Sequence, residues 1–518
     1  MKISGNNNLA GALLSFDKRY NDKSCLVCHD QSISYAQLKL NSIKTANGLI
    51  REGAQKGARV AVISKDCIQN YEVFFACALS QTVMLGVNWR LQKEEIDYML
   101  THSGAEFLFI SAEFYDKLKD LELITSGALR VIIIDKDYPA WRDAQANTEL
   151  SLQYDENDAV VQLYTSGTTG QPKGVVLAHC TFFNLLQGMA DEGDLWMDLN
   201  QKDTLLLSLP IFHIGGLWWA VQGLLVGAKG LIMEYFSAPV ALDYIHQHKA
   251  TKVALVPAMI QFMLAEPDCQ QRDFSSVEAL LYGASPISPA LLKQAMSTFD
   301  CRFFQIYGMT ETGNMAVCLR PDDHSPEQVS LTKAAGKALP GVQIKVVNSN
   351  SQTLATGQTG EIVIKSPSRM LGYWNNEEET QKVMQDGWIR TGDVGYLDEH
   401  GYLYICDRIK DMIIYASENI YPAEIEAVIN DHPGVKEVAV VGKPDERWGE
   451  IVLAFVVPQA NASLKKREIV QCVQAKLADF KAPKAVEFID ALPRNASGKV
   501  LKRSLRSPLW NGRDRQIN

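Results

Sequence analysis

The sequence predicts an α/β protein. We expect a large N-terminal domain, in which helices cover parallel-rich sheets and a barrel-like subdomain follows, and a small α+β domain at the C-terminus. The first observation is that short β-branched runs, such as residues 59–64 and 106–111, alternate with helical patterns, such as residues 38–51 and 70–79. Strand, helix and strand in succession favour a parallel sheet. The second observation is that, after about residue 340, turns rich in Gly, Asn and Asp separate short strands.

The other elements of the N-terminal part continue this alternation. We expect strands at 130–135, 205–209, 252–257, 279–283 and 302–308, a helix from about Gly216, and a helix at 240–248. The sequence shows no internal repeat and no low-complexity segment.

The C-terminal part contains two different patterns. Strands at 344–347, 361–365 and 401–406, with a hairpin-type turn at 398–401, predict an antiparallel or barrel-like unit. A helix at 422–430, strands at 435–442 and 451–458, and a helix at 464–479 predict a separate small α+β domain. We place the boundary at the charged run 408–411 and expect domains at 1–409 and 410–518.

Composition is that of an ordinary globular protein of 518 residues, with 47% hydrophobic and 21% charged residues. The 51 Lys and Arg residues against 60 Asp and Glu leave a formal charge of -9, whereas nucleic-acid binders usually show a basic excess. Ten scattered cysteines in so long a chain are typical of a reducing compartment. We therefore expect a cytoplasmic protein that does not bind nucleic acid.

Two segments carry signals that we interpret as structural. Residues 204–228 have no formal charge and are long enough to cross a bilayer, but Pro210 and His213 interrupt them. We expect a buried strand, a loop and a buried helix there, and no integral membrane span. Cys25 and Cys28 form a lone CxxC with no second pair or His cluster, so we expect a strand and not a zinc site.

The most informative stretch is residues 164–175, which read Tyr-Thr-Ser-Gly-Thr-Thr-Gly-Gln-Pro-Lys-Gly-Val. It follows an apolar strand at 160–164 and precedes a helix-like pattern. Its glycines let the backbone approach a ligand closely, its hydroxyl and N–H groups are free to face that ligand, and Lys173 adds a positive charge. The order Pro-Lys-Gly differs from the Gly-Lys-Ser/Thr of a Walker A loop. The stretch therefore predicts a different kind of polyphosphate-binding loop.

This loop resembles the signature loop of the adenylate-forming superfamily, which includes acyl-CoA synthetases, amino-acid adenylation domains and beetle luciferases. Further stretches resemble other motifs of the superfamily and follow in its order across nearly the whole chain. They are residues 87–91, 209–216, 307–312, 390–393, 407–413, 418–426 and 493–499. The chain looks most like a fatty-acid or aromatic-acid CoA ligase of this superfamily.

The resemblance implies an ATP site. The matching residues are Thr165, Ser166, Gly167, Thr168, Thr169, Gly170 and Lys173 for the phosphates, Gly283, Ala284, Ser285 and Tyr307 for the adenine, Thr310 for the α-phosphate, Asp393 and Arg408 for the ribose, and Lys499 for the carboxylate and the α-phosphate. Glu311 matches the ligand of Mg²⁺, a hard cation that offsets charge at the α-phosphorus. The expected catalytic residues are Lys173, His213, Thr310, Glu311 and Lys499.

The resemblance also implies an acyl pocket and a thiol tunnel. The pocket residues are expected to be mostly apolar: Phe212, His213, Trp218, Ala258, Met259, Phe262, Gly308 and Met309. His213 matches an aromatic or His gate between pocket and tunnel, and a satisfied core histidine is the alternative. Lys410 matches the hinge about which the small domain rotates, withdrawing Lys499. The tunnel strand holds Ala416, Ser417 and Glu418, where many CoA-forming members have Gly-Gly before the Glu.

We therefore expect an ATP-dependent carboxylic acid:CoA ligase. Acid and MgATP would give an acyl-adenylate and pyrophosphate, and the CoA thiol would then displace AMP. A medium- or long-chain fatty acid is the first expectation, with Mg²⁺ as cofactor and ATP and CoA as co-substrates. The alternatives are an aromatic or alicyclic acid, a ligase that loads a carrier protein, and a non-catalytic nucleotide-binding relative. A homodimer is left open.

Overall fold

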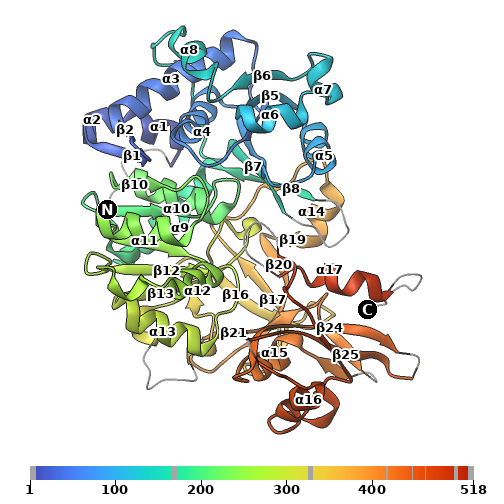
Figure 1. Ribbon diagram of the computed structural model, residues 1–518. Helices are drawn as coiled ribbons and strands as arrows, with labels where there is room; N and C mark the ends of the chain where they lie inside the picture. Colours follow the sequence, from blue (N-terminus) through green and yellow to red (C-terminus); the bar gives the residue numbers. More distant parts are fainter. Residues whose placement is uncertain are drawn as a thin grey trace.

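The computed structural model describes residues 7–165, 172–324, 331–415, 418–445, 447–460, 462–494 and 500–510. Within these residues two large sheets and an antiparallel sheet form the N-terminal part, and a smaller sheet forms the C-terminal part (Figure 1). Strands and helices are numbered in chain order. No helix among the described residues has the length and apolar character needed to span a membrane.

The first large sheet has nine strands, whose central members run parallel. Their spatial order is β15 (Lys337–Ala338), β14 (Val317–Leu319), β13 (Arg302–Tyr307), β12 (Ala279–Gly283), β11 (Lys252–Leu255), β9 (Thr204–Leu207), β10 (Lys229–Ile232), β1 (Ser24–Cys28) and β2 (Gln31–Ser34). Cys25 and Cys28 lie in β1 as expected.

The second large sheet has seven strands, parallel except at the β18–β8–β7 side. Their order is β18 (Gly372–Tyr373), β8 (Lys173–Ala178), β7 (Ala159–Thr165), β4 (Val83–Gly86), β3 (Arg59–Ile63), β5 (Ala105–Ile110) and β6 (Arg130–Ile133).

Helices fill the space between these sheets and cover their outer faces. They are α1 (Leu9–Leu14), α2 (Phe16–Tyr20), α3 (Tyr35–Arg51), α4 (Ile68–Ser80), α5 (Lys93–Ser103), α6 (Ala112–Leu118), α7 (Glu122–Thr125), α8 (Tyr138–Asp143), α9 (Asn184–Asp191), α10 (Ile214–Leu225), α11 (Ala238–His248), α12 (Pro257–Ala265) and α13 (Pro289–Phe299).

The alternation of side chains along each strand explains this layering. Leu205 and Leu207 of β9 point into the core shared with the other large sheet, while Leu206 points to the opposite face, which α11, α12 and α13 cover. Successive side chains of a strand face opposite sides. Because both faces are covered, these strands are apolar throughout and not alternating. Helices α4 and α10 lie between the two sheets and are buried almost all round.

The antiparallel sheet follows, as the change of pattern predicts. Its order is β16 (Gln343–Val347), β17 (Gly360–Lys365), β20 (Trp388–Leu397) and β19 (Met384–Gln385), with β21 (Leu403–Arg408) also paired to β20 and α14 (Glu377–Val383) beside it. The expected hairpin turn joins β20 to β21, and Gly401 there has φ 80°.

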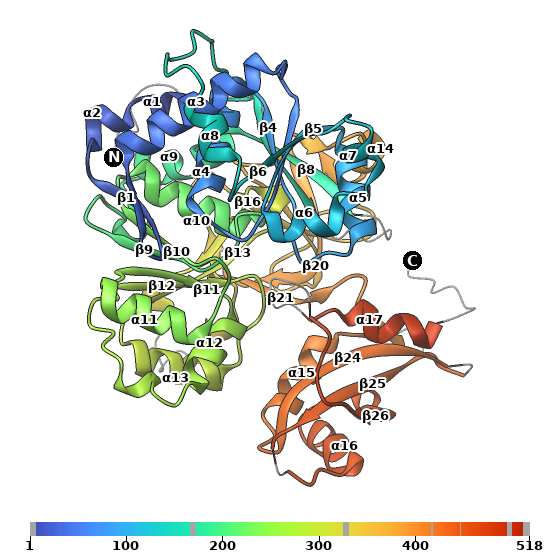
Figure 2. The same cartoon turned by 45° about the horizontal axis from the view of Figure 1, so that its top comes forward.

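The C-terminal part is a separate small unit, which lies to one side of the rest in Figure 2. Its sheet contains β23 (Glu418–Ile420), β22 (Ile413–Tyr415), β25 (Gly449–Pro458), β24 (Val435–Asp445) and β26 (Ala485–Phe488), with α15 (Pro422–Asn430), α16 (Lys466–Gln474) and α17 (Lys502–Arg506) around it. The expected helix at 464–479 is too long at both ends. After α16 the chain turns, so that Leu477 and Phe480 pack on the core of this unit.

Candidate active site

Four neighbouring parallel strands of the first sheet, β9, β11, β12 and β13, end at the same edge. The segments that leave this edge contain Phe212 and His213 after β9, Ala258 after β11, Ala284 after β12, and Gly308 after β13. Ligands of open α/β sheets bind outside the carboxyl ends of the strands. The sequence-predicted adenine and acyl residues, which are far apart in the chain, are therefore brought to one edge.

The hairpin of β7 and β8 frames the phosphate loop. Thr165 is the last residue of β7 and pairs in register with Lys173, the first residue of β8. Residues Ser166, Gly167, Thr168, Thr169 and Gly170 lie outside the described residues. The helix-like pattern expected after the loop begins later than its first residues: residues 173–178 form a strand that is buried at every position. A 3-10 turn at His179–Phe182 and helix α9 follow that strand.

Glu311 lies beside this hairpin and is only 4% exposed. The Tyr373 hydroxyl donates a hydrogen bond to Glu311 Oε1 over 2.9 Å, and Thr165 Oγ1 lies 3.5 Å from the same oxygen. Burial raises the pKa of the Glu311 carboxyl above its ordinary value. Glu311 is thus a poorly hydrated carboxylate that gains from a nearby cation.

Lys173 is held next to this carboxylate. Its ammonium pairs with Glu379 of α14 and lies 5.2 Å from the centre of the Tyr373 ring. The side chain is 9% exposed, so the pair is partly desolvated. Lys173, Tyr373 and Glu311 therefore form one connected polar group at the base of the phosphate loop.

A second polar group joins the first sheet to the antiparallel sheet. The Tyr307 hydroxyl donates to Asp393 Oδ2 over 2.6 Å, and Arg408 Nε lies 3.4 Å from Asp393 Oδ1. Asp393 and Arg408 are register partners on β20 and β21. The expected adenine and ribose residues are thus in direct contact. Gly283, at the end of β12, faces Ile306 so closely that an added Cβ would lie 2.5 Å from its carbonyl oxygen.

The expected acyl residues divide into buried and open positions. Phe212 and Met259 are buried, Trp218 is buried with its ring 6.3 Å from that of Trp196, and Phe262 is 55% exposed. The residues at half-buried positions are Ala258, Gly308, Met309, Thr310 and Ser285, and Ala284 is exposed. Trp218 therefore packs within the core between the sheets, and Phe262 lies at the surface of α12.

His213 precedes α10 in the middle of these residues. Its Nε2 atom is buried and has no hydrogen-bond partner among the described residues. Burial, and then the nearby Arg90, lower the pKa of His213 to about 4. The described residues therefore supply no partner for this nitrogen, which the alternative of a satisfied core histidine would need.

The junction of the two parts contains Lys410, between β21 and β22. Arg506 of α17 donates to the Lys410 carbonyl oxygen over 2.7 Å and to Asp411 Oδ1 over 3.0 Å. Burial lowers the pKa of Lys410. Glu418 begins β23 and is exposed. Ala416, Ser417 and Lys499 lie outside the described residues.

Sequence reasoning missed Tyr373, Glu379 and Asn314. Tyr373 and Glu379 follow Lys173 by some two hundred residues, and no spacing rule joins such distant positions. Asn314 gave a local signal, since it lies just beyond the 307–312 motif that the sequence singles out.

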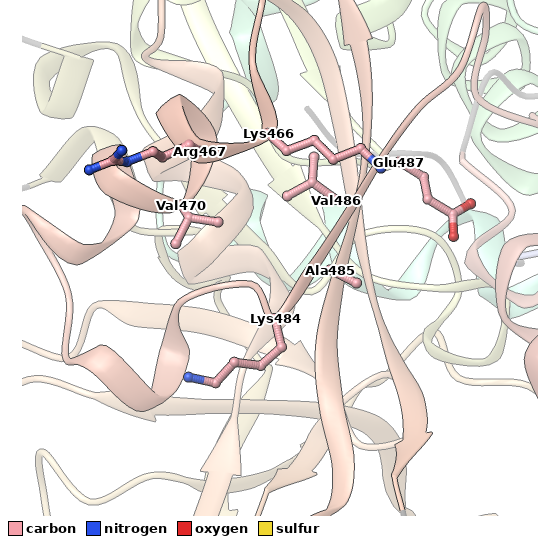
Figure 3. Close-up of a pocket in the computed structure, with 7 residues that line it drawn as sticks. All are labelled: Lys466, Arg467, Val470, Lys484, Ala485, Val486 and Glu487. Carbon is pink, nitrogen blue, oxygen red and sulfur yellow. The ribbon is translucent and has the colours of Figure 1, made fainter.

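A separate shallow hollow lies on the C-terminal unit between α16 and β26 (Figure 3). Its lining residues include three cations, Lys466, Arg467 and Lys484, and one carboxylate, Glu487. It is distinct from the polar groups described above.

Comparison with known proteins agrees with this geometry. The family model described as AMP-binding enzyme matches residues 15–374, and that described as AMP-binding enzyme C-terminal domain matches residues 424–499. A fatty acid–[acyl-carrier-protein] ligase, ScoC, of Streptomyces coeruleorubidus is 44% identical over 95% of both chains. An indoleacetate–CoA ligase of Aromatoleum aromaticum is 34% identical over 93% of this chain and 94% of the relative.

Solved structures are similar over nearly the whole chain. ATP-bound MatB from Rhodopseudomonas palustris superposes with a TM-score of 0.89 at 29% identity, over 97% of this chain and 99% of that one. The o-succinylbenzoate CoA synthetase of Bacillus subtilis, in complex with its acyl-adenylate intermediate, gives a TM-score of 0.83 at 30% identity, over 95% and 97% of the two chains. This chain therefore belongs to the AMP-binding enzyme family of adenylate-forming ligases.

Proposed function

We propose that this protein is an AMP-forming acid–thiol ligase that activates a medium- or long-chain fatty acid with ATP and transfers the acyl group to CoA. The observation that carries the proposal is the position of two polar groups on the segment that ends β13 and follows it, which contains Tyr307 and Glu311. One contains Lys173, Tyr373 and Glu311, and the other contains Tyr307 and Asp393. The first suits a polyphosphate and the second a nucleoside.

In the adenylation step an oxygen of the acid attacks the α-phosphorus, and the bond to the β-phosphate breaks, so that pyrophosphate leaves. Tyr307 would stack on adenine while Asp393 and Arg408 bind the ribose. Lys173 would leave Glu379 for the phosphates, because a phosphate is a stronger partner for a desolvated ammonium. Lys499 and Thr310 would hold the reacting oxygens at the α-phosphorus.

Glu311 fits a Mg²⁺ ligand. It is a buried carboxylate with a hydroxyl neighbour, Thr165, and Mg²⁺ usually takes one or two protein oxygens with the rest from phosphates and water. The described residues contain no group of three or more His, Cys, Asp or Glu that could enclose a metal. When bound, Mg²⁺ would offset the charge that develops on the phosphates.

We also propose a domain boundary between residues 409 and 410, with rotation about Lys410. Adenylation and thiol transfer need different groups at one site, and a hinge can exchange them. After rotation Lys499 would be withdrawn, and the segment with Ala416, Ser417 and Glu418 would border the thiol. His213 would then gate the path from thiol to acyl carbonyl, and AMP would leave as the thioester bond forms.

Two alternatives keep the same adenylation chemistry. An aromatic or alicyclic acid is supported by the indoleacetate–CoA ligase that shares 34% identity. Transfer to a carrier protein is supported by the 44% identical fatty acid–[acyl-carrier-protein] ligase and by the three cations of the α16–β26 hollow, which suit an acidic protein. A cytoplasmic location and a homodimer stay predictions.

The proposed function is tested by pyrophosphate release across fatty, aromatic and alicyclic acids, with CoA, with a phosphopantetheinylated carrier protein, and with neither. The expected result is release with fatty acids and an acyl-CoA product seen by mass spectrometry. A product on the carrier alone would favour the carrier alternative. Background release for every acid would refute ligase activity.

The role of Lys499 is tested by Lys499→Ala with supplied acyl-adenylate. We expect adenylation to be lost while thioester formation from acyl-adenylate continues, because the lysine acts in the first step alone. Loss of both half-reactions would show that the assignment to one step is wrong.

A further inference from the structure

Two buried nitrogen atoms at the carboxyl edge of the first sheet have no hydrogen-bond partner among the described residues. They are Nε2 of His213 and Nδ2 of Asn314. A buried donor without a partner costs about 1–3 kcal/mol, and native proteins usually satisfy such groups. Two such atoms at one edge therefore point to a ligand that supplies their partners.

Asn314 is held firmly in this place. Its backbone N–H donates to the Met309 carbonyl oxygen over 3.1 Å, and its own carbonyl oxygen lies so close to Gly308 that an added Cβ there would be 2.1 Å away. Asn314 is 8% exposed and has φ 91°. Asn tolerates positive φ better than most residues, although at a cost. A strained residue with an unpaired buried amide is expected where function requires it.

The side chain of Asn314 reaches the first turn of α10. Its oxygen lies 3.8 Å from the position that a Cβ on Gly215 would take. His213 is the residue before this 12-residue helix and gives it no side-chain cap. The first N–H groups of a helix have no partner within it and carry partial positive charge. The Asn314 side chain and His213 thus both lie at the amino end of α10, and the unpartnered Nδ2 of Asn314, which is a donor, favours an oxygen acceptor.

The groups that meet here favour a neutral oxygen over a second carboxylate. Asn314 and the helix end carry no full charge, and the buried His213 ring is neutral at pH 7 because burial, and then the positive charge of Arg90, lower its pKa to about 4. Arg90 also interacts with the Asp66 carboxyl, so a carboxylate at this place would have to share that cation. A buried carboxylate without a cation costs far more than a hydroxyl or keto oxygen with two donors. The site lies between the segments that contain Phe212 and Gly308, which are expected to line the acyl pocket.

We propose that Asn314, with His213 and the amino end of α10, determines substrate specificity by binding a hydroxyl or keto oxygen on the chain of the acid. The preferred acid would then be an oxygenated fatty acid and not an unsubstituted one. This inference rests on the proposed function, since it names the substrate class of the same site.

The test compares octanoic acid with each of its positional monohydroxy isomers and with octanedioic acid, by kcat/KM for pyrophosphate release. We expect one or two hydroxy isomers to exceed octanoic acid about tenfold, which corresponds to one satisfied buried hydrogen bond. Octanedioic acid is expected to be poor.

Asn314→Gly removes the amide and keeps the positive φ without strain. It should lower kcat/KM for the preferred hydroxy acid about tenfold and leave that for octanoic acid nearly unchanged. Asn21→Gly is the matched control, because Asn21 also has positive φ, 36°, and is exposed in another part of the chain. A thermal melt of each variant reports folding.

Four results would overturn the inference. Octanoic acid used as well as every hydroxy isomer, or equal losses for all acids in Asn314→Gly, would refute it while the proposed function stands. Preference for octanedioic acid would show that the site binds a charge. Absence of pyrophosphate release with every acid, in a protein that still folds, would refute the proposed function and this inference together.

Discussion

The Tyr307 hydroxyl donates a hydrogen bond to Asp393 Oδ2 over 2.6 Å and so links the first sheet to β20. Tyr307→Phe keeps the ring for stacking and removes this bond. We expect the KM for ATP to rise about tenfold, because a hydrogen bond to a carboxylate is worth about 1.5–3 kcal/mol and here orients the group expected to bind ribose. Steady-state kinetics with varied ATP at saturating acid measures the effect.

Tyr396→Phe is the control for that change. Tyr396 lies on β20, three residues after Asp393, and its ring stacks on that of Tyr404, with ring centres 4.9 Å apart. Tyr396→Phe should leave the KM for ATP unchanged. If Tyr307→Phe raised the KM for the acid and not that for ATP, Tyr307 would belong to the acyl site.

The Lys173–Glu379 pair predicts that ATP competes with a protein carboxylate. Glu379→Gln should lower the KM for ATP severalfold, because the phosphates no longer displace an ion pair that is partly desolvated. The neighbouring Glu378 is exposed and pairs with Lys382 over 2.6 Å, so Glu378→Gln is a matched control with no expected effect. A higher KM in Glu379→Gln would instead mean that Glu379 holds Lys173 in its binding position.

Local pattern was sufficient to predict most of the fold. Runs such as β3 and β12 are short, apolar and flanked by helical patterns, and a strand buried on both faces needs nothing more. The start of the helix after the phosphate loop was not predictable, because residues 175–178 carry apolar residues at consecutive positions, which fit a buried strand and a buried helix equally. Pairing with β7, a long-range contact, decides between them.

The candidate site also contains some residues that the sequence could predict and others that it could not. Glu311 and Asp393 lie in recognisable motifs, so their positions were predictable. Tyr373, which donates to Glu311, and Glu379, which pairs with Lys173, are joined to the site through tertiary contacts between β18, α14 and β8. Such contacts follow from the sheet order and from no spacing in the sequence.

The C-terminal helix α17 is joined to α15 by an ion pair, and we expect this pair to stabilise the C-terminal unit. Lys502 pairs with Glu426 over 2.8 Å, and Glu426 and Asp407 raise the pKa of Lys502 against the opposing effect of burial. Lys502→Met removes the cation and leaves the half-buried Glu426 carboxylate without it. We expect the C-terminal unit to lose about 3 kcal/mol of stability, seen as earlier cleavage there in limited proteolysis.

Lys436→Met is the control for Lys502→Met. Lys436 is exposed on β24 in the same unit, and its loss should not change the cleavage pattern. Equal sensitivity of the two variants to protease would show that the α17 pair does not stabilise the unit.

Asp66 predicts a stability that falls as pH rises. Burial raises its pKa to about 8, from an ordinary value of 3.8, even though the Ile211 N–H donates to Oδ2 over 3.2 Å. The folded protein therefore holds a proton on Asp66 at pH values where the unfolded chain has lost it. The favourable contribution of Asp66 to stability is complete below the unfolded pKa of 3.8 and is lost as pH rises through about 8.

In Asp66→Asn the amide oxygen can still accept a hydrogen bond from the Ile211 N–H, and no charge is buried at any pH. In thermal melts, the Tm of Asp66→Asn relative to that of the wild type should rise by a few degrees between about pH 5 and about pH 9. Asp22→Asn, at an exposed position, should show no such divergence. A gap between Asp66→Asn and wild type that stays constant or narrows with pH would mean that Asp66 remains ionised in the folded protein.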